Sequence, residues 1–191
     1  MSRYLNIATT PSVAAAQEHY GSAEQWARIG ARGVSDETAQ TQRLGPAETA
    51  FIQGRDGFYL ASVSETGWPY VQYRGGPAGF LTIVDSSMLG FADFRGNRQY
   101  ITTGNVRAND RVSLFLMDYV HRRRLKIYGH MQVIDAEDDA ELAKRLTVPG
   151  YPARVERLVL IAVEAFDWNC PQHITPRLTQ AELERLRTQP T

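Results

Sequence analysis

Hydrophobic and polar residues alternate along most of the middle of the chain. Seven runs rich in β-branched and aromatic residues stand out, at residues 58–65, 70–74, 80–85, 88–93, 111–119, 123–135 and 157–168. A period of two places successive side chains on opposite faces of a strand, so each run is predicted to be a β-strand. Short turns such as Thr66-Gly67 and Ser86-Ser87 predict three hairpins. Many strands joined by short turns favour an antiparallel barrel over a parallel sheet with crossover connections.

Helices are predicted towards both ends of the chain and in the gaps between strands. Residues 11–30 are typical of two short helices broken near Gly21. Their predicted caps are Ser12 and Ser22, and their predicted stop is Gly30. Pro46 fits the first turn of a helix that runs to about residue 54. The remaining helices are predicted over residues 97–105, 136–146 and 179–187, the last opening with the capping-box spacing Thr179-Gln180-Ala181-Glu182.

The composition is that of an ordinary globular chain without net charge. Of its 191 residues, 43% are hydrophobic and 22% are charged, which allows one sizeable core. The 21 basic and 21 acidic residues cancel, which removes the usual electrostatic argument for a nucleic-acid or membrane-surface partner. Lys126 and Lys144 are the only lysines, and the arginine excess suits bidentate recognition of phosphate or carboxylate groups. The base composition of a genome would produce the same bias.

The sequence also predicts a cytoplasmic protein. Cys170 is the only cysteine, which excludes an intrachain disulfide and a thiolate metal cluster. The N-terminal stretch MSRYLNIATTPSVAAAQ lacks the continuous apolar core of a signal peptide. No stretch approaches the roughly 18 apolar residues that a membrane-spanning helix needs.

Motifs of several enzyme classes are missing from the sequence. It has no glycine-rich dinucleotide or nucleoside-triphosphate loop, no zinc-protease helix, no hydrolase elbow and no Cys-X-X-Cys pair. The histidines fall on different predicted elements without ligand spacing, and they are His19, His121, His130 and His173. The acidic run at residues 135–141 favours a solvated helix face over a cation site, because a helix N-terminus stabilises carboxylates. No metal site is predicted.

The stretch FADFRGNRQYITTGN, at residues 91–105, is the strongest candidate for a ligand site. It predicts a strand that turns into a helix, with Arg95 and Arg98 in the turn. A helix N-terminus offers free backbone N–H groups and partial positive charge, and Arg98 adds a fork suited to phosphate oxygens. The alternative is that Asn97 caps the helix while both arginines are solvated.

Two further stretches combine polar and aromatic residues with glycine or proline. YVQYRGGP, at residues 70–77, runs from a strand into two glycines and a proline, where backbone is open to close approach by a ligand or forms a hairpin corner. DWNCPQHITPR, at residues 167–177, follows the last strand, and its prolines hold it extended. It is interpreted as a rigid edge around a planar ligand or as a cover over the barrel mouth.

Together these stretches resemble the pyridoxamine 5′-phosphate oxidase-like family of flavin-binding split barrels. The resemblance spans roughly residues 45–178, between a helical extension at 1–44 and a C-terminal helix at 179–191. It implies a mainly β protein with flanking helices, folded as an antiparallel Greek-key split β-barrel. It also implies that FMN lies between the two subunits of a homodimer.

The resemblance gives twelve candidate cofactor-binding residues, which are Gln72, Tyr73, Arg74, Gly75, Ala92, Asp93, Asn97, Arg98, Gln99, Arg124, Trp168 and Arg177. Arg98 and Gln99 match the family's basic phosphate-binding pair, where Gln99 halves the local charge and Arg74 or Arg95 is a candidate to compensate. Arg124, Trp168 and Arg177 match contacts to the flavin ring, the last two from the partner subunit.

Two departures separate the chain from pyridoxamine phosphate oxidase itself. Pro77 stands where the oxidase has a lysine for the vitamin phosphate, and the C-terminal substrate motif has no counterpart. The resemblance therefore implies an FMN-dependent oxidoreductase of unassigned small-molecule substrate, with NAD(P)H as a candidate donor. The alternatives are a non-catalytic flavin- or haem-binding module, with His121, His130 and His173 as candidate haem ligands, and a barrel kept only for dimerisation.

Overall fold

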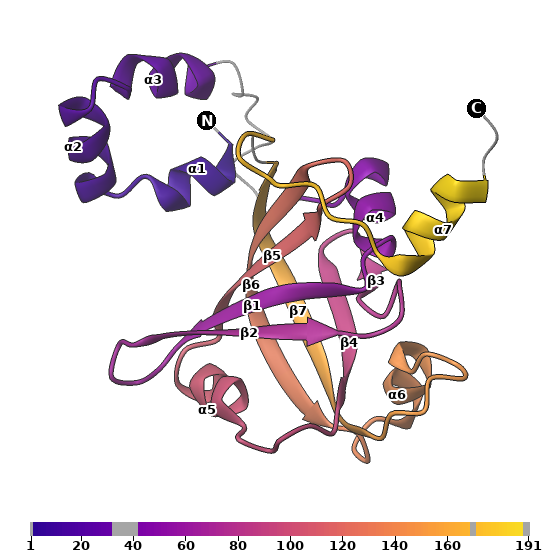
Figure 1. Cartoon of the computed structure of the whole chain (residues 1–191). Helices are drawn as coiled ribbons and strands as arrows, with labels where there is room; N and C mark the ends of the chain where they lie inside the picture. The colour runs from indigo at the N-terminus through magenta and orange to yellow at the C-terminus, as the bar shows by residue number, and fades with distance from the viewer. Residues whose placement is uncertain (1, 32–41, 169–170, 189–191) are drawn as a thin grey trace.

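The computed structural model describes residues 2–31, 42–168 and 171–188 and contains one seven-stranded antiparallel sheet (Figure 1). Its strands are β1 (Gly57–Val63), β2 (Pro69–Gly75), β3 (Thr82–Asp85), β4 (Met88–Phe94), β5 (Arg111–Asp118), β6 (Arg123–Asp135) and β7 (Val155–Trp168). Hydrogen bonds connect them in the order β2-β1-β5-β6-β7-β4-β3. All seven predicted strands are confirmed, and the three predicted hairpins pair as expected.

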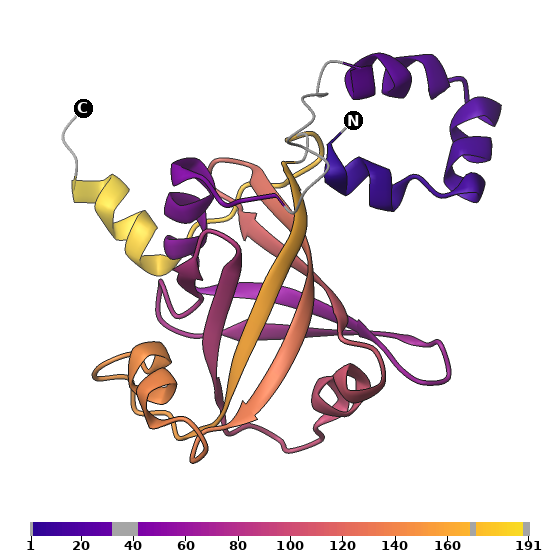
Figure 2. The same ribbon diagram turned by 180° about the vertical axis from the view of Figure 1, so that it is seen from behind.

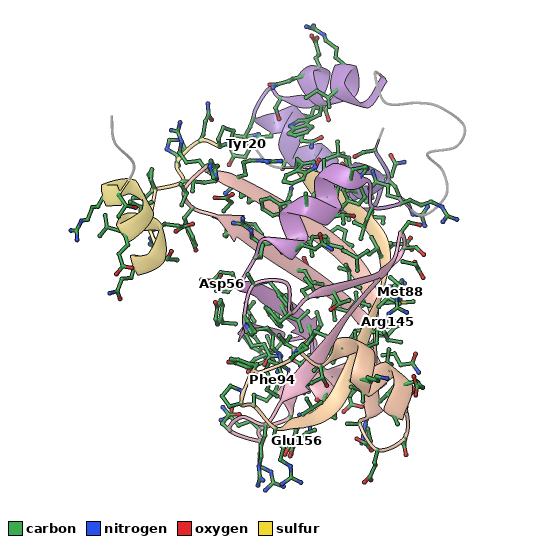
Figure 3. The ribbon with its side chains drawn as sticks, turned by 90° about the vertical axis from the view of Figure 1, so that its right-hand side faces the viewer. Tyr20, Asp56, Met88, Phe94, Arg145 and Glu156 are labelled. Carbon is green, nitrogen blue, oxygen red and sulfur yellow. The ribbon has the colours of Figure 1, made fainter. Side chains whose placement is uncertain are left out.

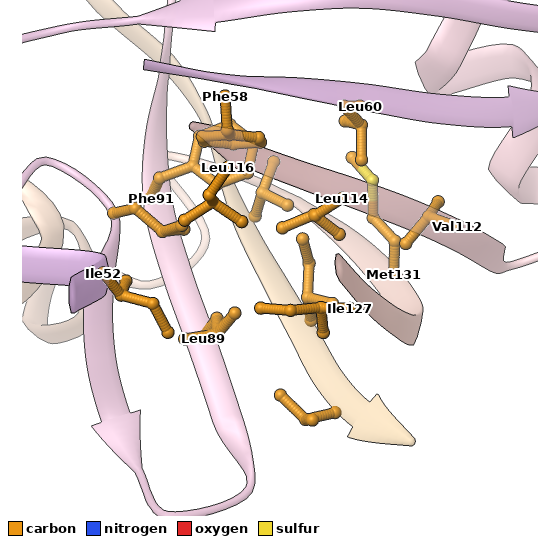
Figure 4. Close-up of a cluster of buried hydrophobic side chains, with 14 of the residues drawn as sticks. Ile52, Phe58, Leu60, Leu89, Phe91, Val112, Leu114, Leu116, Ile127 and Met131 are labelled. Carbon is orange, nitrogen blue, oxygen red and sulfur yellow. The ribbon is translucent and has the colours of Figure 1, made fainter. Parts of the chain in front are cut away.

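The sheet curls around a hydrophobic core that follows from the alternation in the sequence. Along β5, Val112, Leu114 and Leu116 are buried while their neighbours are not. These side chains belong to one cluster with Phe58 and Phe91 from β1 and β4 (Figure 4). Full burial of such a side chain contributes about 1.5–3 kcal/mol, so this cluster is the main source of stability. The strand ladder is not closed, since β2 and β3 form its two edges, and the predicted mainly β split barrel is confirmed.

Helices α4–α7 flank the sheet, and the N-terminal helices α1–α3 extend away from it (Figures 1 and 2). They are α1 (Arg3–Ala8), α2 (Pro11–His19), α3 (Ala23–Ala31), α4 (Pro46–Gln53), α5 (Ile101–Ala108), α6 (Ala140–Leu146) and α7 (Gln180–Thr188). The capping box of α7 is confirmed, because the Thr179 N–H donates to Glu182 Oε2 at 2.8 Å and the Glu182 N–H donates to Thr179 Oγ1 at 3.3 Å. Within the described ranges, no helix is both long and apolar enough to cross a membrane.

Several predicted helix boundaries are wrong. Helix α2 is capped by Thr10 rather than Ser12, because Pro11 takes the first helical position and the Thr10 hydroxyl accepts from the Val13 N–H at 3.4 Å. Helix α3 continues past Gly30. Helix α6 begins only after Asp139, whose carboxylate accepts from the Leu142 N–H at 2.9 Å. The start of the acidic run therefore forms a turn.

The N-terminal extension meets the sheet through α1. Tyr4 is buried and stacks on Tyr128 of β6, with ring centroids 4.4 Å apart and planes 5° from parallel. Arg3 pairs with Glu164 of β7. Helices α2 and α3 then lead away from the sheet (Figures 1 and 2). Residues 32–41, within the predicted extension, and Cys170 lie outside the described residues, and the predicted domain boundaries stay predictions.

Candidate cofactor site

Strand β2 presents its predicted cofactor residues on two faces. Gln72 and Arg74 pair in register with Leu60 and Phe58 of β1, which are core residues, so both point to the inner side of the sheet. Tyr73 points outward and is 60% exposed. Because successive side chains of a strand alternate, a ligand on one face of β2 contacts only one of these two sets through side chains.

A buried carboxylate, Asp93 on β4, holds Arg74, one of the two inward-facing residues of β2, in place. It is 2% exposed and pairs with Arg74 of β2 and Arg157 of β7. Arg157 donates to Asp93 Oδ2 from Nε at 2.9 Å and from Nη2 at 2.7 Å. Burial alone would lower the pKa of Arg157, but the hydrogen bond and charge of Asp93, together with hydrogen bonds to Tyr100 and Glu156, outweigh burial and raise this pKa. Two guanidiniums thus share one buried carboxylate, and Arg157 also pairs with Glu156 through Nη1 at 3.1 Å.

Gln72 links this cluster to the start of α5. In the amide orientation that satisfies its neighbours, its carbonyl oxygen accepts from the Thr102 hydroxyl at 2.5 Å and from Arg74 Nη2 at 3.0 Å. Thr102 is buried in the first turn of α5. The inner group therefore joins β2, β4, β7 and α5 in one polar network.

The loop between β4 and α5 differs from its prediction. Helix α5 begins at Ile101, so the helix predicted over 97–105 starts about one turn too early. Arg98 and Tyr100 have φ angles of 62° and 55°, in the left-handed region that interrupts a helix. Asn97 accepts from the Gln99 N–H at 3.2 Å, which closes a local turn and does not cap α5. The predicted anion site is therefore a turned loop that precedes the helix.

Side-chain contacts hold this loop together and attach it to β7. Arg98 Nε donates to the Tyr100 hydroxyl at 3.0 Å. The Arg157 guanidinium lies 4.6 Å from the centre of the Tyr100 ring. Arg95 Nε instead pairs with Glu156 at 3.5 Å. Figure 3 labels Phe94 and Glu156 at this end of the sheet.

A small cavity of about 60 Å³ opens between β2, β4 and the loop. Half of the predicted residues line it, namely Gln72, Arg74, Asp93, Asn97, Arg98 and Gln99. The sequence analysis missed Arg157, which lines it as well. Three arginines and one aspartate give the lining a net of two positive charges. Such a lining suits a small anion with several acceptor oxygens.

Trp168 and Arg124 lie near the other end of the long strands. Trp168 pairs in register with Leu125 of β6, whereas Arg157 pairs with Asp135, ten residues further along that strand. At about 3.3 Å per residue, the two levels are roughly 33 Å apart along the strand. One chain does not bring Trp168 to the cavity.

Trp168 is held in place beneath α4. Its Nε1–H donates to Glu48 at 2.7 Å, and its ring meets the Phe51 ring edge to face at 4.8 Å. The Arg123 guanidinium lies 4.5 Å from the Trp168 ring centre. Arg124 is next along the strand, and its buried Nε has no hydrogen-bond partner among the residues that the structure describes. An unsatisfied charged donor of this kind is costly, so Arg124 is suited to an added acceptor.

Tyr73 and Arg177 belong to an aromatic group on the outer face. The Tyr73 ring lies 5.6 Å from that of Tyr59, and the Arg177 guanidinium lies 5.1 Å from the Tyr119 ring centre. A hydrogen bond with Tyr59 raises the pKa of Tyr119, and burial raises it further. Gly75 leaves room for Tyr73, since a Cβ there would come within 2.8 Å of its ring.

The remaining predicted residues serve other contacts. Ala92 is buried with Leu146 and Leu158 beneath α6, away from the cavity. Two of the candidate haem ligands are paired with carboxylates, His121 with Asp118 at 3.0 Å and His130 with Asp110 at 3.0 Å. These histidines lie on different elements, in a turn and in β6.

Comparison with known proteins identifies the part of the chain that carries the family pattern. The family model described as pyridoxamine 5′-phosphate oxidase matches residues 44–168, from the segment before α4 to the end of β7. No curated protein sequence matches the chain. The match contains the strands and the loop described above and omits α1–α3.

Solved structures share the fold at low sequence identity. A candidate pyridoxamine 5′-phosphate oxidase from Lactobacillus delbrueckii is 21% identical with a TM-score of 0.51, and the match covers 65% of this chain and 93% of that chain. HupZ from Group A Streptococcus is 13% identical with a TM-score of 0.51, covering 71% and 100% of the two chains. An FMN-binding protein from Syntrophomonas wolfei is 9% identical with a TM-score of 0.50, covering 64% and 83%. These neighbours show the split-barrel fold.

Proposed function

Because the chain belongs to the pyridoxamine 5′-phosphate oxidase family, we propose that it is an FMN-dependent oxidoreductase acting on a small molecule. The observation that carries the proposal is the positively charged cavity beside Arg98, Arg74 and Arg157. Flavin binding by a structural neighbour supports the same cofactor class. Pro77 stands where pyridoxamine phosphate oxidase has a lysine for the vitamin phosphate, which argues against a phosphorylated vitamin as the substrate.

The cavity residues fit the phosphate of FMN. Arg98 is exposed at the cavity rim, where its guanidinium is free to add hydrogen bonds to phosphate oxygens beyond its contact with Tyr100. Gln99 and Asn97 add polar groups from the same loop. Asp93 opposes an anion, but its charge is already shared by Arg74 and Arg157. The net charge of the lining therefore favours phosphate.

Three predicted residues are candidates for contacts to the ring of the cofactor, namely Arg124, Trp168 and Arg177, and Arg124 faces away from Leu125, the register partner of Trp168. Bound FMN would supply the hydride or electron transfer that the protein side chains cannot perform. The buried Nε of Arg124, which lacks a partner within the described ranges, would donate to a ring acceptor. Arg124 and Arg177 would also favour negative charge on the ring through their own positive charge. Trp168 would limit the space available to the ring, since Phe51 and Glu48 fix its position.

The distance between the two groups supports a homodimer. Trp168 and the cavity lie at different levels of the sheet in one chain, so a second copy would bring its Trp168 end to the first copy's cavity. The outer face of β1 and β2 offers a surface for this contact. Its exposed hydrophobic residues are Tyr59, Val63, Val71 and Tyr73, and Trp68 is exposed in the turn between the two strands. Two-fold symmetry would then complete two equal sites.

The test is flavin binding followed by reduction. We expect purified protein to bind FMN much more tightly than riboflavin, because riboflavin lacks the phosphate that the cavity would hold. NAD(P)H should bleach the bound cofactor, and an acceptor or air should restore its colour. Comparable affinities for the two flavins would move the phosphate away from this cavity. A Soret band in place of a flavin spectrum would support the haem-binding alternative, and bound flavin without turnover would support the non-catalytic one.

The predicted cytoplasmic location and the choice of NAD(P)H as donor stay predictions. Both are accessible to direct measurement, by fractionation of cells and by comparison of NADH with NADPH as reductants of the FMN-bound protein.

A further inference from the structure

The loop that carries Arg98 lacks the second basic residue that the family pattern leads one to expect. Gln99 stands at that position, and Arg95 turns to Glu156 instead of the cavity. The additional positive charge comes from β7, where Arg157 lines the cavity 58 positions after Gln99. Its side chain is only 13% exposed, so its position is set by its neighbours.

A chain of contacts runs from Asp93 to Arg98. The Arg157 guanidinium donates two hydrogen bonds to Asp93 Oδ2, from Nε at 2.9 Å and from Nη2 at 2.7 Å. The same guanidinium lies over the ring of Tyr100, 4.6 Å from the ring centre. The Tyr100 hydroxyl then accepts from Arg98 Nε at 3.0 Å. Each group in the chain thus fixes the orientation of the next.

The loop needs such support because its backbone is strained. Arg98 and Tyr100 both have positive φ angles, which non-glycine residues adopt only when surrounding contacts hold them. Arg157 contacts Tyr100 directly, and the Arg95 N–H donates to the Arg154 carbonyl at 2.8 Å at the start of the loop. Arg157 of β7 and Arg154, the residue just before that strand, therefore hold the two ends of this loop.

We infer that Arg157 is a positioning residue of the phosphate site, which holds Tyr100 and through it Arg98 in the orientation that receives the phosphate. The inference rests on the proposed FMN site and assigns to it a residue from outside the loop. Arg157 acts through geometry as well as charge, because its planar guanidinium binds Asp93 with two donors while its face meets Tyr100. A lysine cannot reproduce both contacts.

The test compares Arg157→Gln with Arg154→Gln, which removes an exposed arginine three residues away. We expect Arg157→Gln to weaken FMN binding by about 5- to 30-fold, the factor that corresponds to roughly one or two kcal/mol. Riboflavin binding should change less than about twofold in the same variant. Arg154→Gln should change neither. Arg157→Lys should restore only part of the FMN affinity, and full restoration would show that charge alone is needed and overturn the positioning role.

Hydrogen exchange gives a readout that does not depend on flavin. In the protein without cofactor, amides 96–100 should exchange faster in Arg157→Gln than in Arg154→Gln, while the core strand β5 stays protected. Faster exchange everywhere would indicate a general structural defect and overturn the inference. If Arg157→Gln does not fold, Tyr100→Ala removes the same link at a residue that is 39% exposed and should also weaken FMN selectively.

The two proposals fail in different ways. Wild-type protein that does not prefer FMN to riboflavin would overturn the proposed phosphate site and the inference with it. Wild-type protein that prefers FMN, with Arg157→Gln and Tyr100→Ala equal to it in FMN affinity and loop exchange, would overturn the inference alone.

Discussion

Arg74 on β2 and Asp93 on β4 form an ion pair between two strands that share no ladder in the sheet. Asp93 is 2% exposed, and its second oxygen is taken by Arg157 of β7. The ion pair therefore links the free edge strand β2 to the far side of the barrel, where backbone hydrogen bonds do not close it. The same contact places two guanidiniums at the proposed phosphate site.

Removing the charge of Asp93 should destabilise the protein strongly. Asp93→Asn would take the carboxylate partner from Arg74, while Arg157 would keep its pair with Glu156 at 3.1 Å. Breaking a buried pair in this way costs about 3–5 kcal/mol, and the partial exposure of the arginines favours the lower end. The free energy of unfolding, from urea denaturation of the protein without cofactor, measures this. Asp110→Asn is the control, since its carboxylate is 55% exposed and pairs with His130, and should cost less than about 1 kcal/mol. Equal effects of the two substitutions would show that Asp93 does not organise the cluster.

The strands were predictable because their burial follows from residue type alone. In β1, Phe58 and Leu60 are buried and Tyr59 is exposed, as a period of two requires. Pro46 and the Thr179 capping box likewise fixed helix starts through local hydrogen bonding and geometry. These signals need no knowledge of distant contacts.

The start of α5 and the role of Arg157 could not be predicted in the same way. The positive φ angles of Arg98 and Tyr100 accompany contacts with β7, which lies more than fifty residues away in sequence. Arg157 did leave one signal: it occupies the inward alternate position that Val159 and Ile161 fill further along β7. A charged residue at an inward position requires a buried partner. Only the structure identifies that partner as Asp93.

Arg98 should contribute directly to FMN affinity. Arg98→Ala is expected to weaken FMN binding by about 10- to 150-fold, since a hydrogen bond to a charged group contributes roughly 1.5–3 kcal/mol. The fold should survive, because Arg98 is exposed. Arg95→Ala is the matched control, as Arg95 pairs with Glu156 and does not line the cavity. Flavin fluorescence quenching at fixed salt measures both. A larger effect of Arg95→Ala would mean that the phosphate lies on the other side of the loop.

Gly129 should tolerate no side chain. A Cβ at this position would lie 2.6 Å from Ile161 Cγ2 and 2.7 Å from the Ala162 carbonyl oxygen, at the point where the β6–β7 register shifts. Gly129→Ala is therefore expected to lose about 1–3 kcal/mol of stability through overpacking. Gly104→Ala in α5 meets nothing within 4 Å and should gain about 0.5–1 kcal/mol from the better helix propensity of alanine. Urea denaturation distinguishes the two signs, and a neutral Gly129→Ala would mean that the strands separate at low cost.

The proposed dimer should depend on the outer face of β2. Val71 is 59% exposed on this face, between Trp68 and Tyr73. Contiguous exposed hydrophobic residues of this kind mark interaction surfaces, and a buried unpaired charge there is unfavourable. We expect wild-type protein to be a dimer in light scattering and Val71→Glu to be a monomer at the same concentration. Glu65→Gln, in the neighbouring turn, should stay dimeric. A wild-type monomer that binds FMN stoichiometrically would refute the shared site.

Alkaline pH should weaken the contact of α1 with the sheet through Tyr4. Burial against Tyr128 raises the pKa of the Tyr4 hydroxyl. The unfolded chain ionises this hydroxyl near pH 10, while the folded chain keeps it protonated, so rising pH favours the unfolded state from about pH 10 upward.

Tyr4→Phe keeps the stacked ring and removes the titrating group. Relative to Tyr4→Phe, the wild type should therefore lose about 1.4 kcal/mol of stability between pH 9 and pH 11, since each unit between the two pKa values corresponds to 1.36 kcal/mol. Denaturation of both proteins at the two pH values measures the difference. Tyr20→Phe is the control, because Tyr20 is 82% exposed in the folded protein. An equal wild-type to Tyr4→Phe difference at pH 9 and pH 11 would mean that α1 leaves the sheet before the protein unfolds.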